Sequence, residues 1–132
     1  MRPIRVSCGQ FQAGSVSDNV ATMRDQAADA CSRGAEIIVF PELALTGYLP
    51  APKILDRCQS LDGDGVCQMR DIAQKVGIAV VFGLPELTEG IRYNTMLSLD
   101  SEGGIAGIYR KIHLWKTETW AQPGARIDAY NL

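Results

Sequence analysis

The sequence has little of what metal sites and disulfide scaffolds require. It contains one histidine, and its four cysteines, Cys8, Cys31, Cys58 and Cys67, include no CxxC pair. A zinc site needs several Cys or His ligands at close spacing, and a disulfide framework needs a short chain dense in cysteine. We therefore expect reduced thiols in a cytoplasmic protein.

Neither sign of charge dominates, because 13 basic and 15 acidic residues give a formal charge of −2 at pH 7. No basic stripe indicates nucleic-acid binding, and no polybasic segment indicates a membrane surface. The apolar stretch near the N-terminus is interrupted by Ser7, Gly9 and Gln10, so it is too short for a signal sequence or a spanning helix. The expected partners are small molecules or proteins.

What is present is an alternation of strand and helix patterns within 132 residues that are 46% hydrophobic, enough for one domain with a core. Two runs, 36–40 and 78–84, are continuously apolar, as in strands covered on both faces. Expected strands are 4–10, 36–40, 78–84, 92–99 and 105–114, and expected helices run from a Ser17 cap to Gly34 and from an Asp62 or Asp64 cap to Gly77. This order predicts an α/β fold with a mixed sheet and two main helices.

Charged residues follow the apolar runs at three points. Pro41-Glu42 follows the run 36–40, Pro85-Glu86 follows 78–84, and Lys111 lies in the last strand pattern. We expect Glu42 and Lys111 to reach one rim of the sheet from two neighbouring strands. A carboxylate and an ammonium at one rim can serve as a base and an electrostatic clamp, although either residue alone would be read as a solvated charge.

Several blocks, in this order and spacing, resemble the nitrilase or carbon–nitrogen hydrolase superfamily over almost the whole chain. They are Gly34-Ala35-Glu36-Ile37-Ile38-Val39-Phe40-Pro41-Glu42 with Gly47-Tyr48, then Val81-Phe82-Gly83-Leu84-Pro85-Glu86, Tyr93-Asn94-Thr95 and Tyr109-Arg110-Lys111-Ile112-His113-Leu114. The resemblance implies cysteine-dependent hydrolysis of non-peptide C–N bonds, with small amides or nitriles as substrates and no cofactor.

The resemblance also assigns roles to single residues. Glu42 would be the general base, Lys111 the lysine that stabilises the oxyanion, and Glu118 a second, structural glutamate beside the site. Tyr48 would line the substrate pocket, or simply pack. A thiol is only slightly ionised at neutral pH, so a carboxylate must take its proton as it attacks, and an ammonium must stabilise the tetrahedral adduct.

The sequence departs from the family pattern in one respect. The family's nucleophilic cysteine follows a later strand, and this sequence ends at Leu132, 21 residues after Lys111. Residues 1–132 would then be the N-terminal part of the hydrolase domain, half of a nitrilase-like α-β-β-α sandwich, with the inner sheet face bare. We expect such a chain to associate, as a homo-oligomer or with a complementing C-terminal half.

Three interpretations stay open. The chain can be part of a longer hydrolase, a catalytically inactive binding module that assembles through its bare sheet face, or one half of a site completed by a separate chain. None of its own thiols is an evident substitute for the nucleophile. Cys8 and Cys31 are expected to be buried, Cys67 lies near the start of the second helix with nothing to place it beside Glu42, and Cys58 carries no argument either way.

Overall fold

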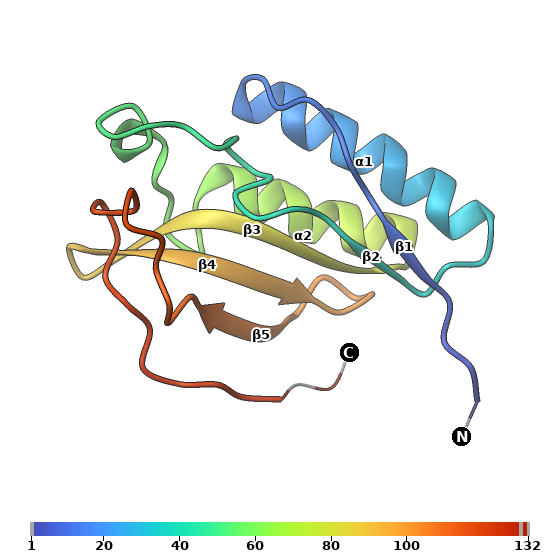
Figure 1. Cartoon of the computed structure of the whole chain (residues 1–132). Helices are drawn as coiled ribbons and strands as arrows, with labels where there is room; N and C mark the ends of the chain where they lie inside the picture. The colour runs from blue at the N-terminus through green and yellow to red at the C-terminus, as the bar shows by residue number, and fades with distance from the viewer. Residues whose placement is uncertain (1, 130, 132) are drawn as a thin grey trace.

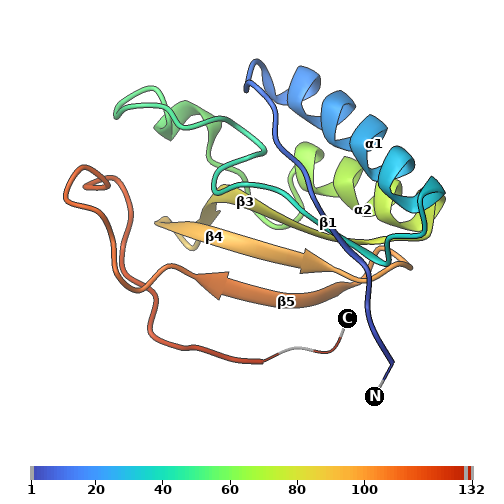
Figure 2. The ribbon, with the colours of Figure 1, turned by 45° about the vertical axis from the view of Figure 1, so that its right-hand side comes forward.

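The computed structural model describes residues 2–129 and 131, and it shows one five-stranded sheet with both α-helices on the same face (Figure 1). The view in Figure 2 shows the same layering from a second direction. The elements are β1 (Val6–Cys8), α1 (Val16–Ser32), β2 (Ile37–Val39), a 3₁₀ turn (Leu55–Arg57), α2 (Asp64–Val76), β3 (Ala79–Thr88), β4 (Ile91–Leu99) and β5 (Ile105–Arg110). The predicted α/β class and element order are confirmed.

The strands lie in sequence order, β1-β2-β3-β4-β5. The first three are parallel, and the last two are antiparallel to their predecessors. Parallel neighbours need long crossovers, and these contain α1 and α2, whereas short turns suffice between β3, β4 and β5. The chain after β5 runs back beside that strand (Figure 2), and residues 126–129 and 131 form no strand.

Both helices begin elsewhere than predicted. Ser15, not Ser17, caps α1, because its side chain accepts from the N–H of Asp18 while the Asp18 carboxylate accepts from the Ser15 N–H, forming a capping box. Gly63, rather than Asp62 or Asp64, is the N-cap of α2. The predicted C-terminal signals were right, since Gly34 and Gly77 both have positive φ just beyond a helix.

Two strand ends also differ from the predictions. β3 does not stop at Pro85 but continues to Thr88. The backbone carbonyl of Pro85 accepts from the N–H of Gln59, so the backbone polar groups of Pro85 point away from β4. Proline has no N–H to donate, but at this position no hydrogen bond between β3 and β4 is lost. β5 ends at Arg110 instead of residue 114, so Lys111 lies just past the strand.

The core lies between the helices and one face of the sheet, where Phe82 and Leu97 are fully buried. The other face is only partly covered, contrary to the cover on both faces that the apolar run 36–40 predicted. Ile38 points into the core, but its neighbours Ile37 and Val39 are only half-buried. Val6 is 52% exposed and Cys8 is exposed too, so the expectation of a buried Cys8 was wrong. Among the described residues, no helix is long and apolar enough to cross a membrane.

Candidate active site

The loop after β2 carries Glu42 across the neighbouring strand. Two backbone hydrogen bonds fasten this loop to Gly83 of β3: the Gly83 N–H donates to the Pro41 carbonyl at 3.2 Å, and the Leu45 N–H donates to the Gly83 carbonyl at 3.0 Å. A Cβ atom on Gly83 would lie 2.2 Å from the backbone nitrogen of Leu43. Only glycine allows the two backbones to approach this closely.

The backbone next to Glu42 is held in a conformation that leucine rarely adopts. Leu43 has φ of 54°, in the left-handed region, and its side chain is buried. Such a conformation costs about 1–2 kcal/mol for a residue with a Cβ, and burial of the leucine side chain offsets about that much. The turn therefore presents Glu42 on the sheet face opposite the helices.

Glu42 and Lys111 meet, although the strands that precede them are not neighbours. β3 and β4 lie between β2 and β5, so the prediction of two adjacent strands was wrong, and the loop over Gly83 spans the gap. The Lys111 ammonium donates to Oε1 of Glu42 at 2.7 Å and to Oε2 of Glu118 at 2.8 Å. The structure thus brings together all three residues that the sequence singled out as catalytic candidates.

Glu118 is the buried member of this group. Its side chain is 1% exposed, against 29% for Lys111 and 42% for Glu42. It lies in a turn after β5 and accepts a further hydrogen bond from the Trp115 N–H at 2.6 Å. A carboxylate buried this completely is stable only when paired and hydrogen-bonded. Its surroundings meet that requirement.

Asn94 is a fourth member that the sequence reasoning did not assign. It lies on β4, is 3% exposed, and its Nδ2 donates to Oε1 of Glu42 at 2.7 Å and to Oε1 of Glu118. The backbone carbonyl of Asn94 accepts from the backbone N–H of Lys111 at 2.8 Å. The available signal was a polar amide amid strand residues inside a family motif, since a buried asparagine needs partners.

The electrostatics of the cluster keep the ammonium and the buried carboxylate charged. Burial raises the pKa of Glu118, but hydrogen bonds from Lys111, the Trp115 N–H and Asn94 outweigh it, so this pKa lies below its ordinary value. Burial lowers the pKa of Lys111, but hydrogen bonds and charge from Glu118 and Glu42 outweigh that, so it lies above its ordinary value. Lys111 is therefore a fixed cation over the working range of pH.

A hollow of about 330 Å³ opens beside the cluster. Its lining comprises Glu42, Gly83, Asn94, Thr95, Met96, Tyr109 and Lys111. Tyr48 is not among these residues, and its side chain is 59% exposed. His113, the single histidine, is exposed as well. Glu42 and Lys111 thus border a space large enough for a small organic molecule, whereas Tyr48 does not line it.

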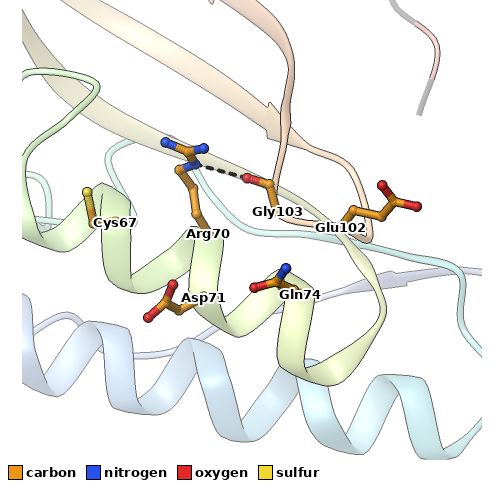
Figure 3. A pocket seen from close by; sticks show the side chains of 6 residues that line it. All are labelled: Cys67, Arg70, Asp71, Gln74, Glu102 and Gly103. Carbon is orange, nitrogen blue, oxygen red and sulfur yellow. Dashed lines mark hydrogen bonds between the residues drawn. The ribbon is translucent and has the colours of Figure 1, made fainter.

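The thiols lie elsewhere. Figure 3 shows Cys67 on α2 in a surface groove with Arg70 and Gln74, opposite Glu102 and Gly103 of the β4–β5 turn. Helix α2 packs on the sheet face opposite Glu42, so the sheet separates this thiol from the cluster. Cys31 and Cys58 are half-buried, and burial raises the pKa of the Cys58 thiol. No group of three or more His, Cys, Asp or Glu side chains within the described part of the chain could hold a metal ion.

Taken together, the cluster offers an exposed carboxylate as a proton acceptor and a fixed ammonium beside an open hollow. A general base must lie within hydrogen-bonding reach of its proton donor, and an oxyanion is best stabilised by a cation that is already in place. The cluster contains both groups but no side chain of the described residues that could attack a substrate carbon. Its chemistry is that of proton transfer and charge stabilisation.

Comparison with known proteins gives consistent results. The carbon-nitrogen hydrolase family profile matches residues 5–130. An (R)-stereoselective amidase of Pseudomonas sp. is 32% identical over 67% of this chain and 32% of its own length, and a nitrilase of Pyrococcus abyssi is 32% identical over 73% and 38%. An amidase of Nesterenkonia AN1, from the nitrilase superfamily, superimposes with a TM-score of 0.84 at 27% identity, over 93% of this chain and 49% of the solved chain.

The chain thus spans about half the length of that solved relative and about a third of the curated ones. Within that span the profile covers nearly every residue, including the loop with Glu42, the end of β5 and the turn with Glu118. The strand order and the two helices agree with the same assignment. The chain belongs to the carbon–nitrogen hydrolase family, of the nitrilase superfamily.

Proposed function

We propose that this chain forms the base-and-clamp half of a cysteine-dependent carbon–nitrogen hydrolase that acts on small amides or nitriles. The single observation that carries the proposal is the shared contact of Lys111 with Glu42 and Glu118 at 2.7 and 2.8 Å beside the hollow. The loop after β2 and the segment after β5, which are far apart in the sequence, converge there. A structural ion pair would need neither the open hollow nor the exposed carboxylate.

Each member has a distinct role in the proposed reaction. Glu42 takes the proton of a cysteine thiol as the sulfur attacks the substrate carbon. Lys111 stabilises the negative charge that develops on the substrate oxygen, or nitrogen for a nitrile. From an amide, the amine or ammonia leaves with a proton from Glu42; from a nitrile, a first water must add to the thioimidate before ammonia leaves. Glu42 then activates water to hydrolyse the thioester. Glu118 holds Lys111 in place, and Tyr48, which does not line the hollow, contributes to substrate binding only if further segments close the site around it.

The nucleophile is proposed to come from outside these 132 residues, which are the N-terminal part of the hydrolase domain. A mutant of the Nesterenkonia amidase has been solved with acrylamide added to its active-site cysteine, and the present chain covers 51% of that protein. The sheet face that bears Glu42 also carries the half-buried Ile37, Val39, Val81 and Met96. A second sheet packed on this face would bury these side chains and could bring the cysteine to the hollow.

The first experiment is to read the coding sequence beyond Leu132, in all three frames, for a strand followed by cysteine. The enzyme completed with that segment, or with the C-terminal half of a relative supplied separately, is then assayed for ammonia release from short amides and nitriles. Glu42→Ala and Lys111→Ala are each expected to lower kcat by about 10²-fold or more. Turnover that survives both substitutions unchanged contradicts the proposed roles.

A second function is favoured by one observation, the exposed apolar residues on the sheet face. Val6, which pairs with Ile37 in the sheet, is 52% exposed, and association through this face would cover it whether or not a cysteine is delivered. In that case the chain is an assembly module without activity. Sedimentation of the purified chain separates the cases: a folded monomer at micromolar concentration argues against an association surface, and a dimer without turnover argues for the module.

A further inference from the structure

Asn94 contacts all three of the other cluster members, and it does so through different atoms. Its side-chain amide reaches Glu42 and Glu118, and its backbone carbonyl binds the backbone of Lys111. An asparagine amide has two N–H donors, and both point to carboxylate oxygens here. The two acidic neighbours also fix which way the amide faces, because its oxygen would be repelled in that position.

The hydrogen bonds divide unequally between the two carboxylates. Both oxygens of Glu118 accept, Oε1 from Asn94 and Oε2 from Lys111 and the Trp115 N–H. In Glu42, Oε1 accepts from both Asn94 and Lys111, whereas no donor among residues 2–129 and 131 contacts Oε2. Neither oxygen of Glu118 is free of a donor. Glu42 has one free oxygen, and it belongs to the more exposed of the two side chains.

Asn94 carries no charge, and this affects how readily Glu42 can act as a base. Two carboxylates already share one ammonium, so a third carboxylate would add repulsion, while a second cation would stabilise the Glu42 carboxylate and weaken it as a base. An amide supplies two donors and no charge. It can therefore orient Glu42 while weakening it as a base less than a second cation would.

We propose that Asn94 is a positioning residue that occupies Oε1 of Glu42 and so selects Oε2 as the oxygen that accepts the proton during catalysis. This inference rests on the proposed hydrolase function. Asn94 touches neither substrate nor nucleophile in it, and acts through Glu42 and Glu118. The same amide also hydrogen-bonds to Glu118, whose role is to hold Lys111 in place. The hydrogen bonds thus assign the base role to Glu42 and not to Glu118.

The first arm of the test needs no activity. The side-chain carboxyl of Glu118 is titrated by carbon-detected NMR in the 132-residue chain as wild type, Asn94→Ala and Asn94→Asp. We expect its titration to move to higher pH in the alanine variant, which lacks a donor, and further in the aspartate variant, which adds a charge. Asn94→Ser is used if Asn94→Asp does not fold. An unmoved Glu118 titration in folded variants overturns the inference.

Asn19→Asp is the matched control. Asn19 is 1% exposed and also donates from its side chain, at 3.2 Å to the Leu45 carbonyl. Its replacement should destabilise the fold as any buried amide change does, yet leave the titration of Glu118 where it was. An equal displacement in the Asn19 variant would mean that the effect reports loosened packing, and this outcome also contradicts the inference.

The second arm measures rate against pH in the completed enzyme. Asn94→Ala should lower kcat by about 10- to 100-fold, as misorientation of a catalytic group does, with KM changed by about twofold or less. The acid limb of the rate profile should move to higher pH. Equal changes in kcat and KM with an unmoved limb would contradict a positioning role. If the completed wild-type enzyme shows no turnover while the Glu118 titration moves as expected in the Asn94 variants, the proposed hydrolase function is refuted instead.

Discussion

Two acid–base clusters lie back to back across the end of the sheet, and two of their three corresponding pairs of residues are adjacent in the sequence. Each glutamate follows a proline, Glu42 after β2 and Glu86 within β3. Their cations are neighbours, Lys111 and Arg110, and point to opposite faces because side chains alternate along an extended chain. Asn94 serves the first cluster and Thr95 the second.

The clusters differ in how completely their polar groups are paired. Glu86 is fully buried and accepts two hydrogen bonds from Arg110, at Nε and Nη2, and one from Thr95 at 2.6 Å. Arg110 also lies over the ring of Tyr93, at 4.3 Å from the ring centre. In the first cluster Glu42 is partly exposed and keeps one oxygen free. The second cluster, Glu86 with Arg110 and Thr95, is thus a brace in which both carboxylate oxygens accept hydrogen bonds, whereas the first cluster leaves Oε2 of Glu42 open.

The largest expected effect on stability belongs to the brace. Arg110→Met leaves the Glu86 carboxylate buried beside Thr95 alone, and loss of a partner from a buried pair costs about 3–5 kcal/mol. We expect the free energy of unfolding, measured in urea, to fall by about 3 kcal/mol, the lower end of that range, because the Arg110 side chain is 35% exposed. Arg126→Met, at an exposed ion pair, is the control and should change stability by about 0.5 kcal/mol or less. Equal losses of stability in the Arg110 and Arg126 variants would contradict a special structural role for the Glu86 cluster.

An intermediate effect is expected where the Glu42 loop crosses β3. Gly83→Ala places a methyl group against the backbone of Leu43, which cannot yield as a side-chain tip could. Overpacking of this kind costs about 1–3 kcal/mol, and the displaced loop should also withdraw Glu42 from Asn94. Gly14→Ala, where the nearest atom is 3.4 Å away and belongs to a side chain, is the control. Unchanged stability in Gly83→Ala would show that the close approach is not required.

A smaller effect is expected from acid. The pKa of Glu118 is lowered in the folded state, despite burial, by hydrogen bonds from Lys111, the Trp115 N–H and Asn94. The stability it contributes is present above the unfolded-state pKa and is lost as pH falls through the folded-state value. Glu118→Gln should therefore flatten the acid side of stability against pH in urea titrations. The control is Glu102→Gln, at an exposed turn, and a wild-type slope in Glu118→Gln would contradict the assignment.

The smallest effect is expected in the groove of Figure 3. Cys67→Ser alters an exposed thiol on the helix side of the sheet, and surface changes of this kind shift stability by about 0.5 kcal/mol or less. Ammonia release by the completed enzyme should stay unchanged, and Glu102→Ala, across the groove from the thiol, serves as a second neutral change. A large loss of turnover in Cys67→Ser would mean that the thiol reaches the reactive cluster after all.

Much of the fold was predictable because the patterns are local. Continuous apolar runs located β2 and β3, and glycine after each helix located its end. Helix starts were missed because several polar residues precede each helix, and only the three-dimensional position of Ser15 or Gly63 decides which one caps. The exposure of Cys8 was missed since alternation identifies a strand face without showing what lies over it.

Some residues of the candidate site could likewise be predicted from the sequence, and others could not. Glu42 and Lys111 could be found because motif order links them, and Glu118 follows at a plausible distance. Asn94 has no charge to attract notice, and its importance lies in two hydrogen bonds that no sequence spacing reveals. The crossing of the loop over Gly83 was equally hidden, because it depends on contact between segments that lie far apart in the sequence.

The central claim is that the open cluster performs chemistry while the brace behind it does not. The most direct measurement compares Glu42→Gln with Glu86→Gln in the completed enzyme, as ammonia released per folded molecule, with the folded fraction taken from circular dichroism. Glu42→Gln is expected to lower kcat by about 10²-fold or more, while Glu86→Gln loses stability but keeps its rate within a few-fold. Equal rate losses in the two variants, or full activity in Glu42→Gln, would contradict the account.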